Sequence, residues 1–229
     1  NIDTEEVDVD SFTAKVEHDF NDLVSLNSIT RYSETDNRTV TTRSYVETLG
    51  NGQYKYRSGS GNGRDTTTKL AINQTNPVWN FATGFIDHSL VTGVEVSRET
   101  IDKTNFSNNL DLDQVYDLDN PPGYYRGPRH KTDTSYLDAE LTDQALYVFD
   151  TLALNDQWDL TLGARWERYE GNNDNYVIED DERTKLESTD EMLSGRVGLA
   201  YKPVENGTIY VAWGNSYNPS GELGTYGGT

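Results

Sequence analysis

The chain has 229 residues, of which 39 are Asp or Glu and 19 are Lys or Arg, so its formal net charge is −20. This charge argues against nucleic acid as a partner, because phosphate binding requires clustered cations. Cysteine is absent, which excludes disulfides and thiolate metal sites, and no apolar run approaches the roughly 20 residues that a membrane helix needs.

The first part of the chain contains four segments in which apolar and polar residues alternate, as they do in a half-buried β-strand. The first covers residues 7–18, and a change of phase near Asp10 predicts a β-bulge. A short turn at residues 20–22 leads to the second, from 24 to 32. The third covers residues 64–84, with Pro77 as an expected irregularity, and after the turn at 85–88 the fourth runs from 90 to 96.

Four further strands are predicted at residues 145–151, 158–169, 193–201 and 209–217, with tight turns at 155–157 and 203–207. The segment 158–169, WDLTLGARWERY, alternates almost without interruption. Its apolar face contains Trp158, Leu160, Leu162, Ala164 and Trp166. Tryptophan at both ends of an apolar face is typical of lipid contact, because aromatic rings lie at the two membrane interfaces. These five residues are therefore predicted to face lipid.

The connections between these segments alternate between tight turns and long loops, and the long ones cover residues 33–63, 100–134 and 170–190. Outer-membrane barrels have short periplasmic turns and long extracellular loops. The fold class we predict is all-β, a segment of an antiparallel transmembrane β-barrel with about eight strands. With tight turns on the periplasmic side, both chain ends lie on the extracellular side, which indicates a piece of a larger barrel.

Three of these strand–turn–strand units resemble a known family. They are FATGFIDHSLVTGVEVSRE at residues 81–99, ALYVFDTLALNDQWDLTLGARWERYE at 145–170 and YKPVENGTIYVAWGNSYNPSGE at 201–222. Each is similar to a hairpin of the TonB-dependent outer-membrane receptors, and the nearest resemblance is to ferric-siderophore receptors of the catecholate type.

The resemblance implies that residues 1–229 belong to a single barrel domain of about 22 strands, whose plug domain and C-terminal strands are not in this sequence. It implies a location in the bacterial outer membrane, contact with its lipid and lipopolysaccharide, and uptake of a ferric siderophore energised by the TonB protein through the missing plug region. No catalytic motif such as G-x-S-x-G or H-E-x-x-H occurs, so neither an enzyme nor a cofactor is expected.

Two groups of cationic and aromatic residues in the long loops are candidates for ligand contact. The larger is in PPGYYRGPRHK and comprises Tyr124, Tyr125, Arg126, Arg129, His130 and Lys131. The smaller comprises Tyr54, Tyr56 and Arg57. Ferric catecholates are anionic and aromatic, so cations supply charge while tyrosine rings stack. The alternative is that these residues anchor the loops on the rim, contact lipopolysaccharide phosphates or only keep the loops soluble.

Other charged residues carry weaker hypotheses. Two acidic clusters, Asp111, Asp113, Asp117 and Asp119, and then Glu179 to Glu182, could bind Ca²⁺, but solvated loop surface is the better interpretation, and we predict no metal site. Arg165, Glu167 and Arg196 are expected on the lumenal face, where they contact the plug or pair within the wall.

Two functions of other classes share parts of this pattern. A passive porin shares the alternation of lipid-facing and lumenal residues. A secreted acidic β-sandwich that binds glycan or calcium would instead place the apolar face of residues 158–166 in a soluble core.

Overall fold

The structure is a computed structural model that describes residues 3–41, 45–57, 60–110, 115–117, 119–120 and 129–218. Within these ranges the chain folds into eleven β-strands. The described residues include no helix that is long and apolar enough to cross a membrane.

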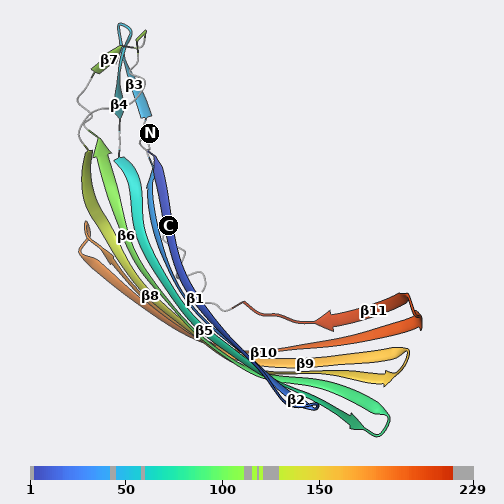
Figure 1. Cartoon of the computed structure of the whole chain (residues 1–229). Helices are drawn as coiled ribbons and strands as arrows, with labels where there is room; N and C mark the ends of the chain where they lie inside the picture. The colour runs from blue at the N-terminus through green and yellow to red at the C-terminus, as the bar shows by residue number, and fades with distance from the viewer. Residues whose placement is uncertain are drawn as a thin grey trace.

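Eight of the strands form one antiparallel sheet in which each strand pairs with the one before and after it. Their bounds are β1 Thr4–Asn21, β2 Val24–Thr41, β5 Ser60–Thr83, β6 Ile86–Leu110, β8 Arg129–Asn155, β9 Trp158–Val177, β10 Glu182–Val204 and β11 Gly207–Gly214. The sheet is strongly bent, with the tight turns at one end (Figure 1). The predicted all-β antiparallel class, with about eight strands, is confirmed.

The tight turns are built by the residues that begin them. The Asn21 side-chain oxygen accepts hydrogen bonds from the backbone N–H groups of Leu23 and Val24, at 2.9 and 3.0 Å. Asn155 does the same for Gln157 and Trp158, at 2.9 and 3.1 Å. An Asn side chain that bonds to the backbone two or three residues later stabilises a turn without help from the rest of the fold. This local chemistry explains why these turns could be predicted.

The strands are longer than the alternation predicted. The loop expected at residues 170–190 is wrong, because β9 continues to Val177, β10 begins at Glu182, and only residues 178–181 connect them. An alternating pattern appears in the sequence only where one face of the strand is apolar. In residues 171–175, GNNDN, both faces are polar, so no alternation is visible. The strands extend beyond the apolar zone, so their outer parts left no periodic signal.

The other two long connections contain a second, smaller sheet. Strands β3 (Tyr45–Gly50) and β4 (Gln53–Arg57) form a hairpin between β2 and β5, and β7 (Val115–Asp117) lies between β6 and β8. β7 pairs with β4, so connections that are far apart in sequence meet in one three-stranded sheet. This sheet lies beyond the end of the large sheet that is opposite the tight turns (Figure 1).

Two predicted irregularities have different outcomes. The bulge expected near Asp10 is wrong, since β1 pairs with β2 without a shift from Thr4 to Asp19. Alternate residues near the start of β1 are acidic. The apolar residues therefore move from one face of β1 to the other, while the backbone pairing continues without a bulge. At Pro77 the β5–β6 ladder has a gap of two residues with the register unchanged on either side, which confirms the irregularity.

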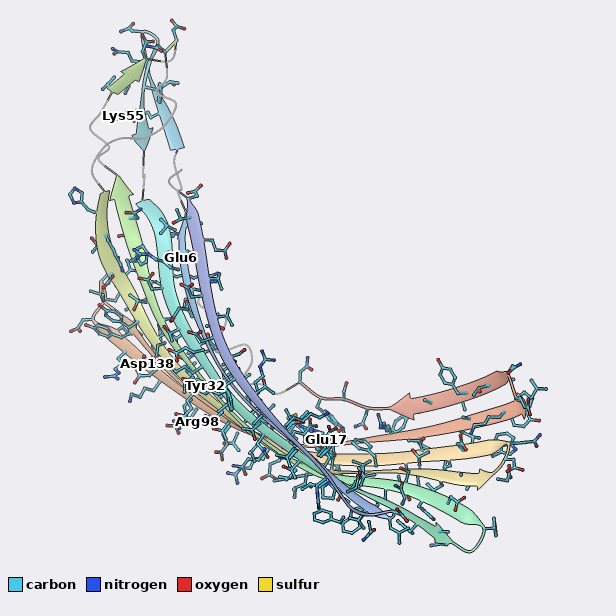
Figure 2. The ribbon with its side chains drawn as sticks, in the orientation of Figure 1. Glu6, Glu17, Tyr32, Lys55, Arg98 and Asp138 are labelled. Atoms are coloured by element: carbon cyan, nitrogen blue, oxygen red, sulfur yellow. The ribbon has the colours of Figure 1, made fainter. Side chains whose placement is uncertain are left out.

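The cross-strand register separates the side chains of the large sheet into two faces. The apolar residues of β9 share a face with Leu146, Val148, Val197 and Leu199. The opposite face is more closely packed, with Ala145 only 2% and Tyr147 8% exposed, and this identifies it as the concave face, because bending brings side chains together there. Arg98 and Asp138 project from the convex side in Figure 2.

Exposure on the convex face separates the competing folds. Leu162 is 43% and Trp166 36% exposed, although both are large and apolar. The sandwich hypothesis placed these residues in a soluble core between two packed sheets, so it is wrong. Across the part of the chain described, one bent sheet presents its apolar residues outward, which is the arrangement of a barrel wall.

Candidate functional site

The structure describes few of the side chains predicted to contact a ligand. Tyr124, Tyr125 and Arg126 lie outside the described residues. Tyr56, Arg57 and Arg129 have described backbone positions, at the end of β4 and the start of β8, but their side chains also lie outside what is described. The side chains of Tyr54, His130 and Lys131 are described, and they lie in three different environments.

Tyr54 is central to the small sheet. It pairs with Thr48 of β3 on one side and Tyr116 of β7 on the other, and only 4% of its surface is exposed. Lys55 of the same strand forms an ion pair with Glu47 at 3.5 Å and points from this sheet in Figure 2. The arrangement gives Tyr54 a role in holding the two connections together, and its ring offers little surface to a ligand in this conformation.

Lys131 faces the convex side because of a β-bulge in β8. Asn105 pairs with Ser135 but Phe106 pairs with Asp133, which leaves Thr134 as an extra residue. One extra residue exchanges the two faces for everything beyond it. Lys131 therefore lies 2.8 Å from Asp65 and 4.2 Å above the centre of the Phe106 ring. The exposed His130, its neighbour, lies on the concave side.

The concave face carries a cluster of charges around Arg165. Its guanidinium lies 3.0 Å from Glu95, 3.0 Å from Glu167 and 3.6 Å from Asp143, and its side chain is only 23% exposed. Three carboxylates surround one cation, so the cluster as a whole is negative when all its groups are ionised. The prediction that Arg165 pairs within the wall is confirmed. Sequence reasoning missed Glu95 and Asp143, although both are on the polar face of their strands.

Next to this cluster, Tyr147 forms a polar contact with β5. Its hydroxyl donates to the Asn76 side-chain oxygen and accepts from Gln74 Nε2 at 2.9 Å. The ring lies over Gly93 of β6, where an added Cβ would be only 2.2 Å from ring carbons. The glycine therefore makes room for the aromatic ring.

Arg196 is placed in a similar way on β10. Its guanidinium lies 4.2 Å from the centre of the Phe149 ring, and that ring lies over Gly163, where an added Cβ would be 2.2 Å from it. The residues directly opposite Arg196 on the neighbouring strands are Gly163 and Gly214. Among the residues that the structure describes, no carboxylate forms an ion pair with Arg196.

On the convex face, aromatic residues border the apolar zone next to the tight turns. Trp158 stacks on Tyr201 with ring centroids 4.5 Å apart. Phe81 stacks on His88 at 4.7 Å, and the His88 ring hydrogen-bonds with Asp150 and Thr83, each at 2.7 Å. All five predicted residues from Trp158 to Trp166 lie on this face. Their contact with lipid stays a prediction.

Farther from the tight turns, the convex face becomes a band of cross-strand charges. Arg183 donates to both oxygens of Asp174 at 2.7 and 2.6 Å, and Lys185 lies 3.2 Å away; the Arg183 bonds, with help from Lys185, lower the pKa of Asp174 to about 2. Burial, and then the neighbouring Asp102 carboxylate, raise the pKa of Asp138 above its ordinary value. These two paired carboxylates thus have pKa shifts of opposite direction. Arg183 and Lys185 contact Asp174 directly, whereas at Asp138 burial and the Asp102 carboxylate outweigh the attraction of Arg183.

The acidic clusters of the sequence do not come together around a possible ion. Residues 179–181 lie in the connection between β9 and β10, and Glu182 is the first residue of β10. All four are exposed. Asp117 and Asp119 lie in or beside β7, while Asp111 and Asp113 fall outside the described residues. No group of three or more His, Asp or Glu side chains that could hold a metal ion occurs in the described ranges.

Comparison with known proteins gives a family and several relatives. The family described as "TonB dependent receptor-like, beta-barrel" matches residues 1–229. Among curated proteins, the probable TonB-dependent siderophore receptor PiuA of Acinetobacter baumannii is 25% identical over 91% of this chain and 30% of its own length. The catecholate siderophore receptor Fiu of Escherichia coli K12 is 26% identical over 96% of this chain and 32% of its own length. The chain thus spans about a third of the length of these relatives.

Solved structures agree with this at the level of the fold. The siderophore receptor PiuA from Acinetobacter baumannii superposes with a TM-score of 0.78 at 22% identity, over 96% of this chain and 33% of that chain. The open form of the ferric-catecholate import receptor Fiu from E. coli K12 gives 0.77 at 23% identity, over 95% of this chain and 36% of that chain. Because the family match extends over every residue, the chain belongs to the TonB-dependent receptor-like β-barrel family.

Proposed function

We propose that this chain is part of the β-barrel of a bacterial outer-membrane receptor that takes up a ferric siderophore, with an anionic catecholate as the ligand class. The observation that carries the proposal is the family match over residues 1–229, together with curated relatives that are named siderophore receptors. The barrel family argues against an enzyme and against a passive porin. The two edge strands of the sheet, β1 and β11, each have one partner among the described residues, in keeping with a wall that continues in a larger barrel.

The location and the partners follow from the same proposal. The apolar convex face, including Leu162 and Trp166, contacts outer-membrane lipid, and the charged band beyond it lies at the level of lipopolysaccharide. Trp158 and Trp166 are eight residues apart, about 26 Å along the strand, which is comparable to the apolar band of an outer-membrane barrel. Energy for uptake comes from the TonB protein, through a plug domain in the complete receptor.

Ligand recognition is assigned to the connections opposite the tight turns. The cations and aromatic rings predicted there, Tyr124, Tyr125, Arg126 and Arg129 above all, belong to connections that the small sheet joins. An anionic aromatic chelate is attracted by guanidinium groups and stacks on tyrosine rings. Of the predicted contacts, Tyr54 is buried and Lys131 is paired on the convex face, so the remaining residues carry this assignment.

The proposal is tested by titrating the complete receptor with the ferric complex of 2,3-dihydroxybenzoate, a simple catecholate. We expect saturable binding, which Arg126→Glu together with Arg129→Glu weakens by at least about tenfold, because charge-assisted contacts become repulsive. Ferric citrate serves as the non-catecholate control. Binding of citrate but not of the catecholate would contradict the ligand class, and unchanged affinity in the double variant would remove the two arginines from the site.

A further inference from the structure

The concave face between β9, β10 and β11 contains a hollow with a volume of about 340 Å³. Its side chains on that face are Arg196, Thr161, Tyr210, Gly198, Ala200 and Ala212. The set combines one cation, one hydroxyl and one phenol with three small residues. The small residues keep the floor open, so the polar groups are accessible from the concave side.

Arg196 is the charged group of this hollow, and its environment differs from that of Arg165 and Lys202, two other cations on the same face. Arg165 is surrounded by three carboxylates, and Lys202 lies 2.5 Å from Asp159. Arg196, by contrast, is exposed and has no ion pair among the described residues. An exposed cation without a carboxylate partner is a place where an anion is favoured by the local charge.

The neighbours of Arg196 fix its orientation as well as its charge. The Phe149 ring supports the guanidinium at 4.2 Å, and the ring itself rests on Gly163. An added Cβ at Gly163 would also be 3.1 Å from Arg196 Cγ. A guanidinium held over an aromatic ring keeps its N–H groups free at the edge, where they can bind both oxygens of a planar anion.

We propose that Arg196, Thr161 and Tyr210 form a binding site for a planar anion on the lumenal face of the wall, separate from the ligand-recognition connections. Arg196 binds a carboxylate or a deprotonated catechol, Thr161 donates a hydroxyl hydrogen bond, and the Tyr210 ring lies alongside the planar group. The anion comes either from a catecholate in passage, which rests on the proposed function, or from an Asp or Glu of the complete receptor itself.

Three variants of the complete receptor test the site. Arg196→Gln removes the charge, and Arg196→Lys keeps it and guards against effects of a disturbed fold. Lys202→Gln is the matched control, because it removes a cation of the same face that Asp159 already neutralises. Each is compared with the wild type in three measurements: uptake of radioactive iron from ferric 2,3-dihydroxybenzoate, thermal unfolding without ligand, and the rise in unfolding temperature caused by free 2,3-dihydroxybenzoate.

The outcomes separate the two sources of the anion. For a ligand in passage, Arg196→Gln lowers uptake by about tenfold and abolishes the rise caused by free 2,3-dihydroxybenzoate, while unfolding without ligand is unchanged. For a resident carboxylate, Arg196→Gln lowers the unfolding temperature without ligand, and Arg196→Lys restores it. If Arg196→Gln equals the wild type in all three measurements, the site does not exist. A wild type that fails to take up the ferric complex contradicts the proposed function, and the two unfolding measurements still decide the site.

Discussion

The ring of Tyr147 lies directly over Gly93, so that a Cβ at that glycine would be 2.2 Å from ring carbons Cε2 and Cζ. The ring cannot move aside at little cost, because its hydroxyl is bonded to Gln74 and Asn76. Gly93→Ala is therefore expected to lower the free energy of unfolding by about 1–3 kcal/mol, the usual range for overpacking. Gly198→Ala is the control, since its nearest neighbour would be 3.8 Å away. Equal stability of the two variants in denaturant unfolding would contradict the packing argument.

Arg165 keeps three carboxylates together on the concave face. Replacing it with Gln leaves Glu95, Asp143 and Glu167 in mutual repulsion while they are partly shielded from water. We expect a loss of about 1–3 kcal/mol in the free energy of unfolding. Adding Asp143→Asn should recover part of that loss, which a double-mutant cycle measures. A double variant as unstable as the sum of the two single variants would mean that the carboxylates do not interact.

The pKa of Asp174, lowered to about 2 by Arg183 and Lys185, predicts a pH-dependent contribution to stability. The ionised carboxylate is favoured by folding, so its contribution is complete above the ordinary pKa of 3.8 and is lost as the pH falls through about 2. Asp174→Asn should lower the unfolding temperature at pH 7, and the difference should shrink in acid. A difference that stays constant over this range would exclude the ion pair as its cause.

Asp138 lies directly opposite Asp174 in the same charged band, and its pKa is shifted in the opposite direction. Because its pKa is raised, the ionised carboxylate is disfavoured by folding, and this penalty grows as the pH rises from 3.8 through the raised value. Asp138→Asn is expected to increase the unfolding temperature at pH 7 and to have no effect below pH 3.8. A loss of stability at pH 7 would show that the Asp138 carboxylate makes a favourable contact that outweighs its burial.

Lipid contact of the convex face is tested by adding a charge to each face. Leu162→Arg should cost about 2–4 kcal/mol in a refolding assay with lipid vesicles, because it places an ion in the apolar zone. Thr151 is exposed and lies on the concave face, so Thr151→Arg should cost far less. Similar costs for the two variants would count against a lipid-facing convex side.

Lys131 provides a test within the predicted ligand contacts. Its ion pair with Asp65 faces the convex side, so Lys131→Gln should leave the affinity for ferric 2,3-dihydroxybenzoate unchanged. The same variant should lower stability by no more than about 1 kcal/mol, as is usual for an exposed ion pair. A clear loss of affinity would return Lys131 to the ligand site.

The sequence was informative wherever the chain has one apolar face and local turn chemistry. The hairpin around Asn155 shows both, since alternation places Trp158 to Trp166 on one face and the Asn side chain closes the turn. The strand extension from Gly171 to Val177 could not be predicted, because residues 171–175, GNNDN, are polar at the positions of both faces and so do not alternate. The bulge at Thr134 was also hidden, and it alone moved Lys131 to the other face.

The sequence predicted which kinds of residue form the functional surfaces, but not which residues of different strands come together there. Arg165, Glu167 and Arg196 were predicted to share one face from the polar positions of their strands, and they do share the concave face. Their partners Glu95, Asp143 and Phe149 come from other strands, and only the register brings them together. The pairing of β4 with β7 is equally non-local, since three residue pairs join segments about 60 residues apart.

The pairing of β4 with β7 changes how the two connections respond to proteolytic cleavage. A protease that cuts one of them leaves the severed strand held by backbone hydrogen bonds to the other, so a single nick would not release it. Each connection also limits the freedom of its partner, which lowers the entropy lost when either is ordered. The small sheet is thus linked along the chain to four strands of the large one, β2, β5, β6 and β8.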